Sequence, residues 1–154
     1  MAKKNSGPGH GSKVYQQKMN FCFGCGKDNL HGMHLKFSLD QARRRFVSNF
    51  RLSRRYTGPP GHCHGGIIAT ILDEAMSKLS KLRDVVAATS QMQVEYLRPV
   101  PLRRPLRVES REISKRGRRL VRRAEIVDEK GTVLARARGV FVIIDPHRVF
   151  LRHK

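Results

Sequence analysis

The chain has 154 residues, enough for one domain with a sizeable core, and its 32 Lys and Arg against 12 Asp and Glu give a formal charge of +20. A charge of this size attracts polyanions, whether nucleic acid, anionic membrane or a phosphate-bearing small molecule. Aromatic residues make up only 6% and Trp is absent, which argues against the stacking platforms of single-strand nucleic-acid binders. The charge therefore indicates a class of binding partner but does not indicate which activity the protein has.

The start of the chain is basic but leads into no apolar segment, so no secretory signal is predicted. No run approaches the roughly 18 apolar residues that a membrane span requires. Three cysteines fit a reduced compartment better than a disulfide framework. We therefore expect a cytoplasmic protein.

Both ends of the chain are basic and poor in apolar residues. Residues 1–18 are rich in Lys, Gly and Ser and predict a flexible tail. Residues 146–154 predict a second, short basic tail. The periodic apolar patterns lie between them, so residues 19–145 are expected to form the folded domain.

Near the start of this domain, Cys22 and Cys25 form a CxxC pair. One interpretation is a zinc site that recruits Cys63 with His62 or His64, which would supply sulfur and nitrogen ligands. The other is a tight glycine-containing turn with two small buried thiols. Because no second CxxC pair is present, the turn is favoured and no metal is predicted.

Two stretches then alternate apolar and polar residues, Leu35–Leu39 and Phe46–Leu52, and this alternation predicts two strands. A helix is expected from about Gly65 to Leu82, because apolar residues recur there at the helical period. That apolar stripe consists of Ile67, Ile68, Ile71, Leu72, Ala75, Leu79 and Leu82.

Asp73 falls on the opposite side of this helix, beside Thr70, Ser77 and Ser80. The stripe can therefore pack on a sheet while Asp73 faces a different neighbour. If that neighbour is a second subunit, the site lies between two protomers.

Four strand-like runs follow the helix: Met92–Tyr96, Pro105–Ser114, Arg118–Asp128 and Val133–Ile143. Short turns separate the last three. One helix and about six strands predict an α+β fold, an antiparallel sheet wrapped around a single long apolar helix.

The step His64-Gly65-Gly66 stands where the helix should begin. Uncovered backbone N–H groups at a helix N-terminus carry partial positive charge and can hold an oxygen that is becoming negative, such as a thioester carbonyl under attack. Asp73 adds a base or nucleophile on the same helix. Alternatively, the glycines only allow another backbone to pass, His64 is a core histidine, and Asp73 pairs with an arginine.

Three segments together resemble the hotdog-fold acyl-CoA thioesterases of the phenylacetic-acid-degradation type: Cys22–Gly26 with Asn29, Gly32 and Leu35, then Gly61–Met76, then Gln93–Pro101. The resemblance covers roughly residues 20 to 144. It implies a hotdog fold, hydrolysis of an acyl- or aryl-CoA thioester without a cofactor, and a homodimer or homotetramer.

The resemblance also implies roles for individual residues. The backbone N–H of Gly65 would polarise the thioester carbonyl, and His64 would orient that end of the site. Asp73 would act across the dimer interface as base or nucleophile. Thr89 would help to hold the attacking water, although a shift in register would put Ser90 in its place.

Many relatives carry Asn or Gln six residues before the histidine, where this chain has Gly58. That side-chain contribution is therefore absent, which leaves open the turnover and the division of labour between Asp73 and Glu74.

For substrate binding we expect the amide of Gly66 and three arginines, Arg116, Arg118 and Arg119, whose guanidinium groups suit the phosphates of coenzyme A. The same arginines could equally form a solvated basic surface.

Two other functions fit the same fold. One is a non-catalytic hotdog module that binds acyl-CoA or nucleic acid through its basic surface. The other, a dehydratase or hydratase, ranks last, because such enzymes place their histidine and carboxylate differently. An intact set of His64, Gly65 and Asp73 favours the hydrolase. The acyl group cannot be read from one chain.

Overall fold

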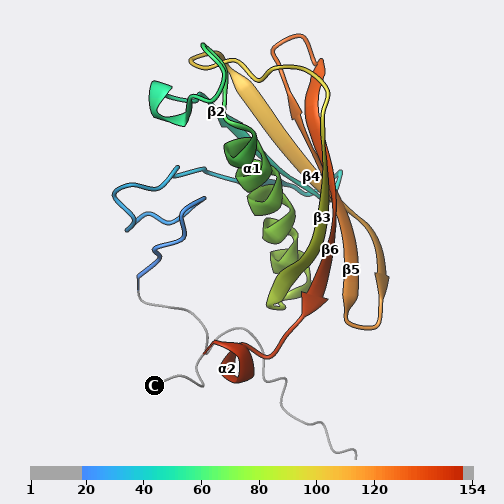
Figure 1. Cartoon of the computed structure of the whole chain (residues 1–154). Helices are drawn as coiled ribbons and strands as arrows, with labels where there is room; N and C mark the ends of the chain where they lie inside the picture. The colour runs from blue at the N-terminus through green and yellow to red at the C-terminus, as the bar shows by residue number, and fades with distance from the viewer. Residues whose placement is uncertain (1–18, 151–154) are drawn as a thin grey trace, which may run out of the picture.

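The computed structural model describes residues 19–150, so the predicted N-terminal tail (residues 1–18) and the last four residues lie outside it. One antiparallel sheet curves around the long helix α1, which lies against a single face of the sheet (Figure 1). The strands are β1 (Ser38–Asp40), β2 (Arg45–Phe50), β3 (Ala87–Tyr96), β4 (Leu106–Arg116), β5 (Arg119–Val127) and β6 (Val133–Ile143). The α-helices are α1 (Gly65–Lys78) and α2 (Pro146–Val149), and 3-10 turns cover Arg54–Tyr56 and Leu79–Arg83.

The strand order is β1-β2-β4-β5-β6-β3, and every neighbouring pair is antiparallel. The α+β hotdog architecture predicted from the sequence is confirmed. The first strand begins at Ser38, later than predicted. The chain before it contacts the CxxC turn instead, since the N–H of Leu35 donates to the carbonyl of Gly24 (2.9 Å). In the segment where the sequence predicts only a tail, α2 forms one turn capped by Asp145.

The apolar side of α1 fills the concave face of the sheet. Its buried residues are Ile68, Ile71, Leu72, Ala75 and Met76, followed by Leu79 in the 3-10 turn. Burying each of the large side chains stabilises the fold by about 1.5–3 kcal/mol. Met76 is an addition to the predicted stripe. The helix is therefore held along its whole length, which fixes where its polar groups point.

Ser80 corrects the sequence prediction. It was expected on the polar side of the helix with Asp73, yet it is only 9% exposed and its hydroxyl accepts a hydrogen bond from the buried Arg122 (2.9 Å). The α-helix ends at Lys78 and continues as a 3-10 turn. Because a 3-10 helix turns about 120° per residue instead of 100°, residues beyond Lys78 rotate away from the predicted side.

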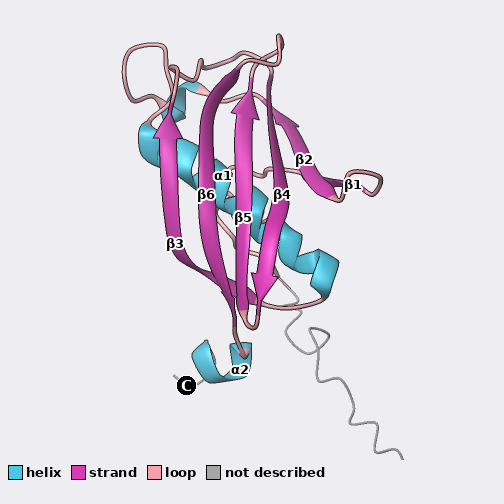
Figure 2. Ribbon diagram, turned by 90° about the vertical axis from the view of Figure 1, so that its right-hand side faces the viewer, coloured by secondary structure: helices cyan, strands magenta, loops and turns pink. Residues whose placement is uncertain are grey.

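Strand β3 forms one edge of the sheet, as Figure 2 shows. It pairs with β6 along its length, and within residues 19–150 no strand pairs with its other side. An edge of this length leaves a row of backbone N–H and C=O groups open to another chain.

Candidate active site

His64 caps the N-terminus of α1 and satisfies all but one of its first amides. Its ring Nδ1 accepts the N–H of Gly66 (2.9 Å), and its carbonyl accepts those of Ile67 (3.0 Å) and Ile68 (3.1 Å). The N–H of Gly65 has no acceptor within the described chain. Because the free amide stands at the positive end of the helix, it is suited to bind an oxygen that gains negative charge.

The two predicted glycines therefore differ. Gly65 offers the open amide, whereas the amide of Gly66, expected to bind substrate, is held by the ring of His64. Tyr96 fixes the same end of the helix, since its hydroxyl donates to the carbonyl of Gly65 (3.0 Å). Sequence reasoning placed Tyr96 only as a strand residue, because nothing in the alternation shows that the end of β3 reaches the helix N-terminus.

The loop before the helix leaves no space for a side chain at position 58, where many relatives carry an amide. A Cβ at this position would lie 2.6 Å from the Cα of His64 and 3.1 Å from its backbone nitrogen. The backbone is fixed there, because Gly58 N–H donates to the carbonyl of His62 (2.9 Å) and His64 N–H to that of Tyr56 (2.8 Å). The glycine thus permits the close approach that sets the position of His64.

Asp73 lies half-buried on the other side of α1 and accepts a hydrogen bond at Oδ1 from the hydroxyl of Thr89 (2.6 Å). Burial raises the pKa of Asp73, the bond from Thr89 opposes that rise, and the charge of Glu74 adds to it. The register of β3 shifts between Thr89 and Gln91, so Ser90 is the extra residue of a bulge. Of the two hydroxyls that the sequence left open, Thr89 is the one that contacts Asp73.

Gly65 and Asp73 do not form one site within a single chain. They are eight positions apart on α1 (65 to 73). At 1.5 Å per residue this separation is about 12 Å along the helix axis. A carbonyl bound to the Gly65 amide is therefore out of reach of Asp73 of the same chain.

The predicted phosphate-binding arginines lie on the β4–β5 hairpin, where Arg116 pairs with Arg119 across a turn that contains Gly117 at φ +57°. All three are exposed. Arg119 is paired with Val142, which is paired with Ala88. The hairpin thus lies at the Thr89 end of the sheet.

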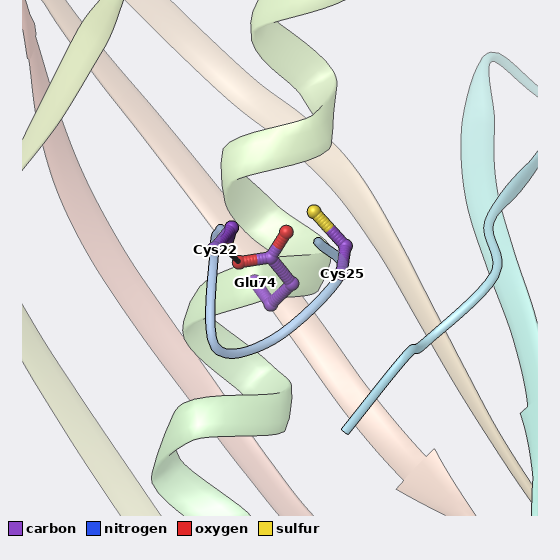
Figure 3. A group of neighbouring side chains, drawn as sticks. All are labelled: Cys22, Cys25 and Glu74. Atoms are coloured by element: carbon purple, nitrogen blue, oxygen red, sulfur yellow. Dashed lines mark hydrogen bonds between the residues drawn. The ribbon is translucent and has the colours of Figure 1, made fainter. Parts of the chain in front are cut away.

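Cys22 and Cys25 lie beside Glu74 on α1 (Figure 3). The prediction of two buried thiols is wrong, because Cys22 is exposed and Cys25 is half-buried. The zinc set considered from the sequence is not assembled: in the described part of the chain Cys63 is buried at the loop near Val100, and the ring of His62 bonds to the carbonyl of Pro60 (2.9 Å). Glu74 is the neighbour that sequence reasoning missed, because only the folded chain brings the CxxC turn onto the helix.

Comparison with known proteins agrees with the fold. Residues 60–135, which contain α1 and the strands after it, match the family model of the thioesterase superfamily. This part of the chain therefore resembles a thioesterase-superfamily domain. The chain is 31% identical over 119 residues to the mouse (Mus musculus) acyl-coenzyme A thioesterase THEM4, covering 76% of this chain and 51% of the relative. The chain thus spans about half the length of this relative and of the rat (Rattus norvegicus) protein of the same name.

Solved structures share the fold. A crystal structure of a thioesterase superfamily protein superposes with a TM-score of 0.75 at 27% identity, covering 80% of this chain and 60% of that one. The Escherichia coli PaaI protein from the phenylacetic acid degradation operon gives a TM-score of 0.62 at 21% identity, covering 66% and 73%. The resemblance to hotdog-fold thioesterases is confirmed. In the described residues no helix is long and apolar enough to cross a membrane.

Gly58→Asn introduces the side chain that many relatives carry, and we expect it to harm this chain. The Cβ clash displaces the His64 backbone and with it the free amide of Gly65. Overpacking of this kind costs about 1–3 kcal/mol. Thermal denaturation should show a lower melting temperature, and thioester hydrolysis should fall. Unchanged stability with faster hydrolysis would contradict this role of Gly58.

Proposed function

We propose that this protein is a thioesterase that hydrolyses an acyl- or aryl-CoA thioester to the free acid and CoA. The observation that carries the proposal is the helix α1, which presents one free amide at its N-terminus and a hydrogen-bonded carboxylate farther along its exposed side. The relative named acyl-coenzyme A thioesterase supports the same chemistry.

In this mechanism the substrate carbonyl accepts a hydrogen bond from the Gly65 N–H, which stabilises the oxyanion by about 3 kcal/mol as the carbonyl is attacked. Asp73 of the partner subunit either takes a proton from the attacking water or attacks the carbonyl itself. The C–S bond then breaks and CoA leaves as the thiolate, which takes up a proton. Where Asp73 itself attacks, water then hydrolyses the anhydride that it forms with the acyl group, which releases the free acid and restores the carboxylate.

The contacts of the two carboxylates favour Asp73 over Glu74 for this role. The bond from Thr89 occupies Oδ1 of Asp73 and leaves Oδ2 for water or substrate. Both oxygens of Glu74 are engaged, Oε1 by Lys78 (3.1 Å) and Oε2 by Cys22 (3.4 Å). The role of His64 is then to cap the helix and to keep Gly65 as the one open amide.

The dimer follows from the 12 Å separation and from the open edge of β3. A two-fold axis makes two edge strands pair antiparallel, so the Thr89 end of one chain lies toward the helix N-terminus of the other. Asp73 of one protomer then approaches the Gly65 amide of its partner. The hairpin of Arg116, Arg118 and Arg119 comes to the same end, where it can contact the phosphates of CoA.

Asp73→Asn tests the carboxylate. Removing the base should lower kcat by about two to four orders of magnitude. The stability of the variant should not fall. Because the pKa of Asp73 is raised in the folded protein above its unfolded value, the ionised carboxylate lowers the free energy of unfolding at neutral pH. This destabilisation disappears as the pH falls through the raised pKa. Hydrolysis by the parent should accordingly decline on the acid side at a pH above the ordinary Asp range. Parent-like turnover in Asp73→Asn would refute the assignment.

Gly65→Pro tests the amide by deleting only the N–H. Proline is favoured at the first position of a helix, and His64 already has the extended conformation (φ −63°, ψ 137°) that a following proline requires. The matched control is Gly65→Ala, which keeps the N–H and whose Cβ would lie 3.5 Å from the Tyr96 ring, an ordinary contact. We expect kcat to fall about 100-fold or more in the proline variant and far less in the alanine variant. An equal fall in kcat in the two variants would show that the Gly65 N–H does not take part in catalysis.

A specific feature also supports a second candidate function, nucleic-acid binding on the face of the sheet away from α1. Register places Arg45 beside Arg111, Arg111 beside Arg123, and Arg123 beside Arg138, in one row across four strands. Like charges directly opposite one another destabilise a sheet. Within residues 19–150, Arg45 is paired with Asp40 and Glu109, whereas the other three arginines have no ion-pair partner.

A hollow of about 300 Å³ lies beside this row, lined in part by Arg123, Arg138 and Gln93. A phosphate backbone laid across the row would relieve the repulsion and needs no aromatic stacking. Because α1 covers the other face of the sheet, this binding would not compete with hydrolysis.

Replacing Arg111, Arg123 and Arg138 together by Gln should weaken binding of a labelled DNA duplex and lower the slope of log affinity against log salt by about 2–3, near one per lost phosphate contact. The control replaces Arg116, Arg118 and Arg119 by Gln, which removes equal charge from the hairpin. It should raise KM for the CoA thioester with a smaller effect on DNA. Equal loss of DNA binding in both variants would show that the net charge of the protein, and not this row of arginines, binds the DNA.

A further inference from the structure

The CxxC turn and α1 form a cluster that the hydrolase mechanism does not use. The Sγ atoms of Cys22 and Cys25 and a carboxylate oxygen of Glu74 all lie within 4.8 Å of one another. Figure 3 shows the two cysteines on either side of the glutamate, which projects from the helix into the turn. Three side chains that can bind a metal, two from a turn and one from a helix, therefore lie close enough together to share one ion.

Two glycines let the turn close onto the glutamate. A Cβ at Gly24 would lie 2.8 Å from Oε2 of Glu74, and a Cβ at Gly26 would lie 2.4 Å from the backbone nitrogen of Cys22. The N–H of Gly26 donates to the carbonyl of Cys22 (2.8 Å), which closes the turn between the two thiols.

The turn is also fixed from its flanks. The side chain of Asn20 accepts the N–H of Cys22 (3.1 Å), and Asn29 donates to the carbonyl of Phe21 (3.1 Å). Asp28 in turn accepts the N–H of Asn20 (2.6 Å). The backbone that carries the two thiols is therefore fixed before any ligand arrives, which lowers the cost of ordering the thiols around one.

Lys78 supports the same group from the following turn of α1. Its Nζ lies 2.7 Å from Sγ of Cys25 and 3.1 Å from Oε1 of Glu74, while Oε2 is the oxygen that faces Cys22. Two thiolates and one carboxylate carry three negative charges, and the lysine supplies one positive charge. The remaining charge of −2 is that which a divalent cation neutralises.

We propose that Cys22, Cys25 and Glu74 bind one Zn²⁺ ion, with a water molecule as the fourth ligand and Lys78 as a positioning residue. Thiolate and carboxylate ligands in a four-coordinate set suit zinc, and soft sulfur ligands select it over magnesium or calcium. Binding releases the two thiol protons to solvent, and the ion joins residues 20–35 to α1. This proposal differs from the sequence prediction, in which the CxxC pair forms a turn without a metal.

The test uses the full chain, reduced with a phosphine and freed of metal by a chelator, then titrated with Co²⁺ and afterwards with Zn²⁺. We expect one Co²⁺ per chain with a thiolate-to-cobalt charge-transfer band that Zn²⁺ removes. Cys22→Ser and Glu74→Gln should each weaken binding at least 100-fold, and Lys78→Met about 10–100-fold. Cys63→Ala, which removes the cysteine outside the cluster, should bind as the parent does.

Circular dichroism establishes that each variant is folded, and Glu74→Gln keeps the test decisive if a cysteine variant does not fold. Three results would overturn the zinc site: no Co²⁺ binding by the reduced parent, a parent-like charge-transfer band in Cys22→Ser, or loss of the band in Cys63→Ala. Because the readout is spectroscopic and needs no substrate, a failed hydrolase assignment leaves this result interpretable, and the reverse also holds.

Discussion

The fixed rise of an α-helix is the constraint on which the proposed function depends. The open amide of Gly65 and the carboxylate of Asp73 belong to the same rigid element, and about 12 Å of helix axis separates them. The sheet holds α1 on its buried side from Ile68 to Leu79, so bending cannot bring the two groups together. A reaction that uses both requires a second helix, and the open edge of β3 offers the means to place one.

The capping of α1 makes this arrangement selective. A helix N-terminus usually presents several unpaired amides, which would bind an anion without a defined geometry. Here His64 takes three of the first four amides with its ring and its carbonyl, and only Gly65 remains. The Gly58 loop sets the position of His64, and Tyr96 holds the carbonyl of Gly65. One donor then points to one site, as catalysis by an oxyanion contact requires.

Sequence periodicity predicted the long helix, the succession of strands and helix along the chain, and the side on which Asp73 lies, because each depends on contacts within one element or on its burial. It could not predict the environment of Ser80, since the change to a 3-10 turn depends on packing against Arg122. It also missed Tyr96 and Glu74. Their partners are distant in sequence, and no local pattern reports that β3 ends at Gly65 or that the CxxC turn lies on α1.

The most direct test of a shared site is to mix two inactive variants. Gly65→Pro keeps Asp73 but lacks the amide, and Asp73→Asn keeps the amide but lacks the base. If each site takes its amide from one protomer and its carboxylate from the other, unfolding and refolding the two together forms mixed dimers with one complete site. About a quarter of the parent's thioesterase activity should return for random pairing. Activity that stays at the level of the separate variants, with mixed dimers shown by mass spectrometry, would contradict the account.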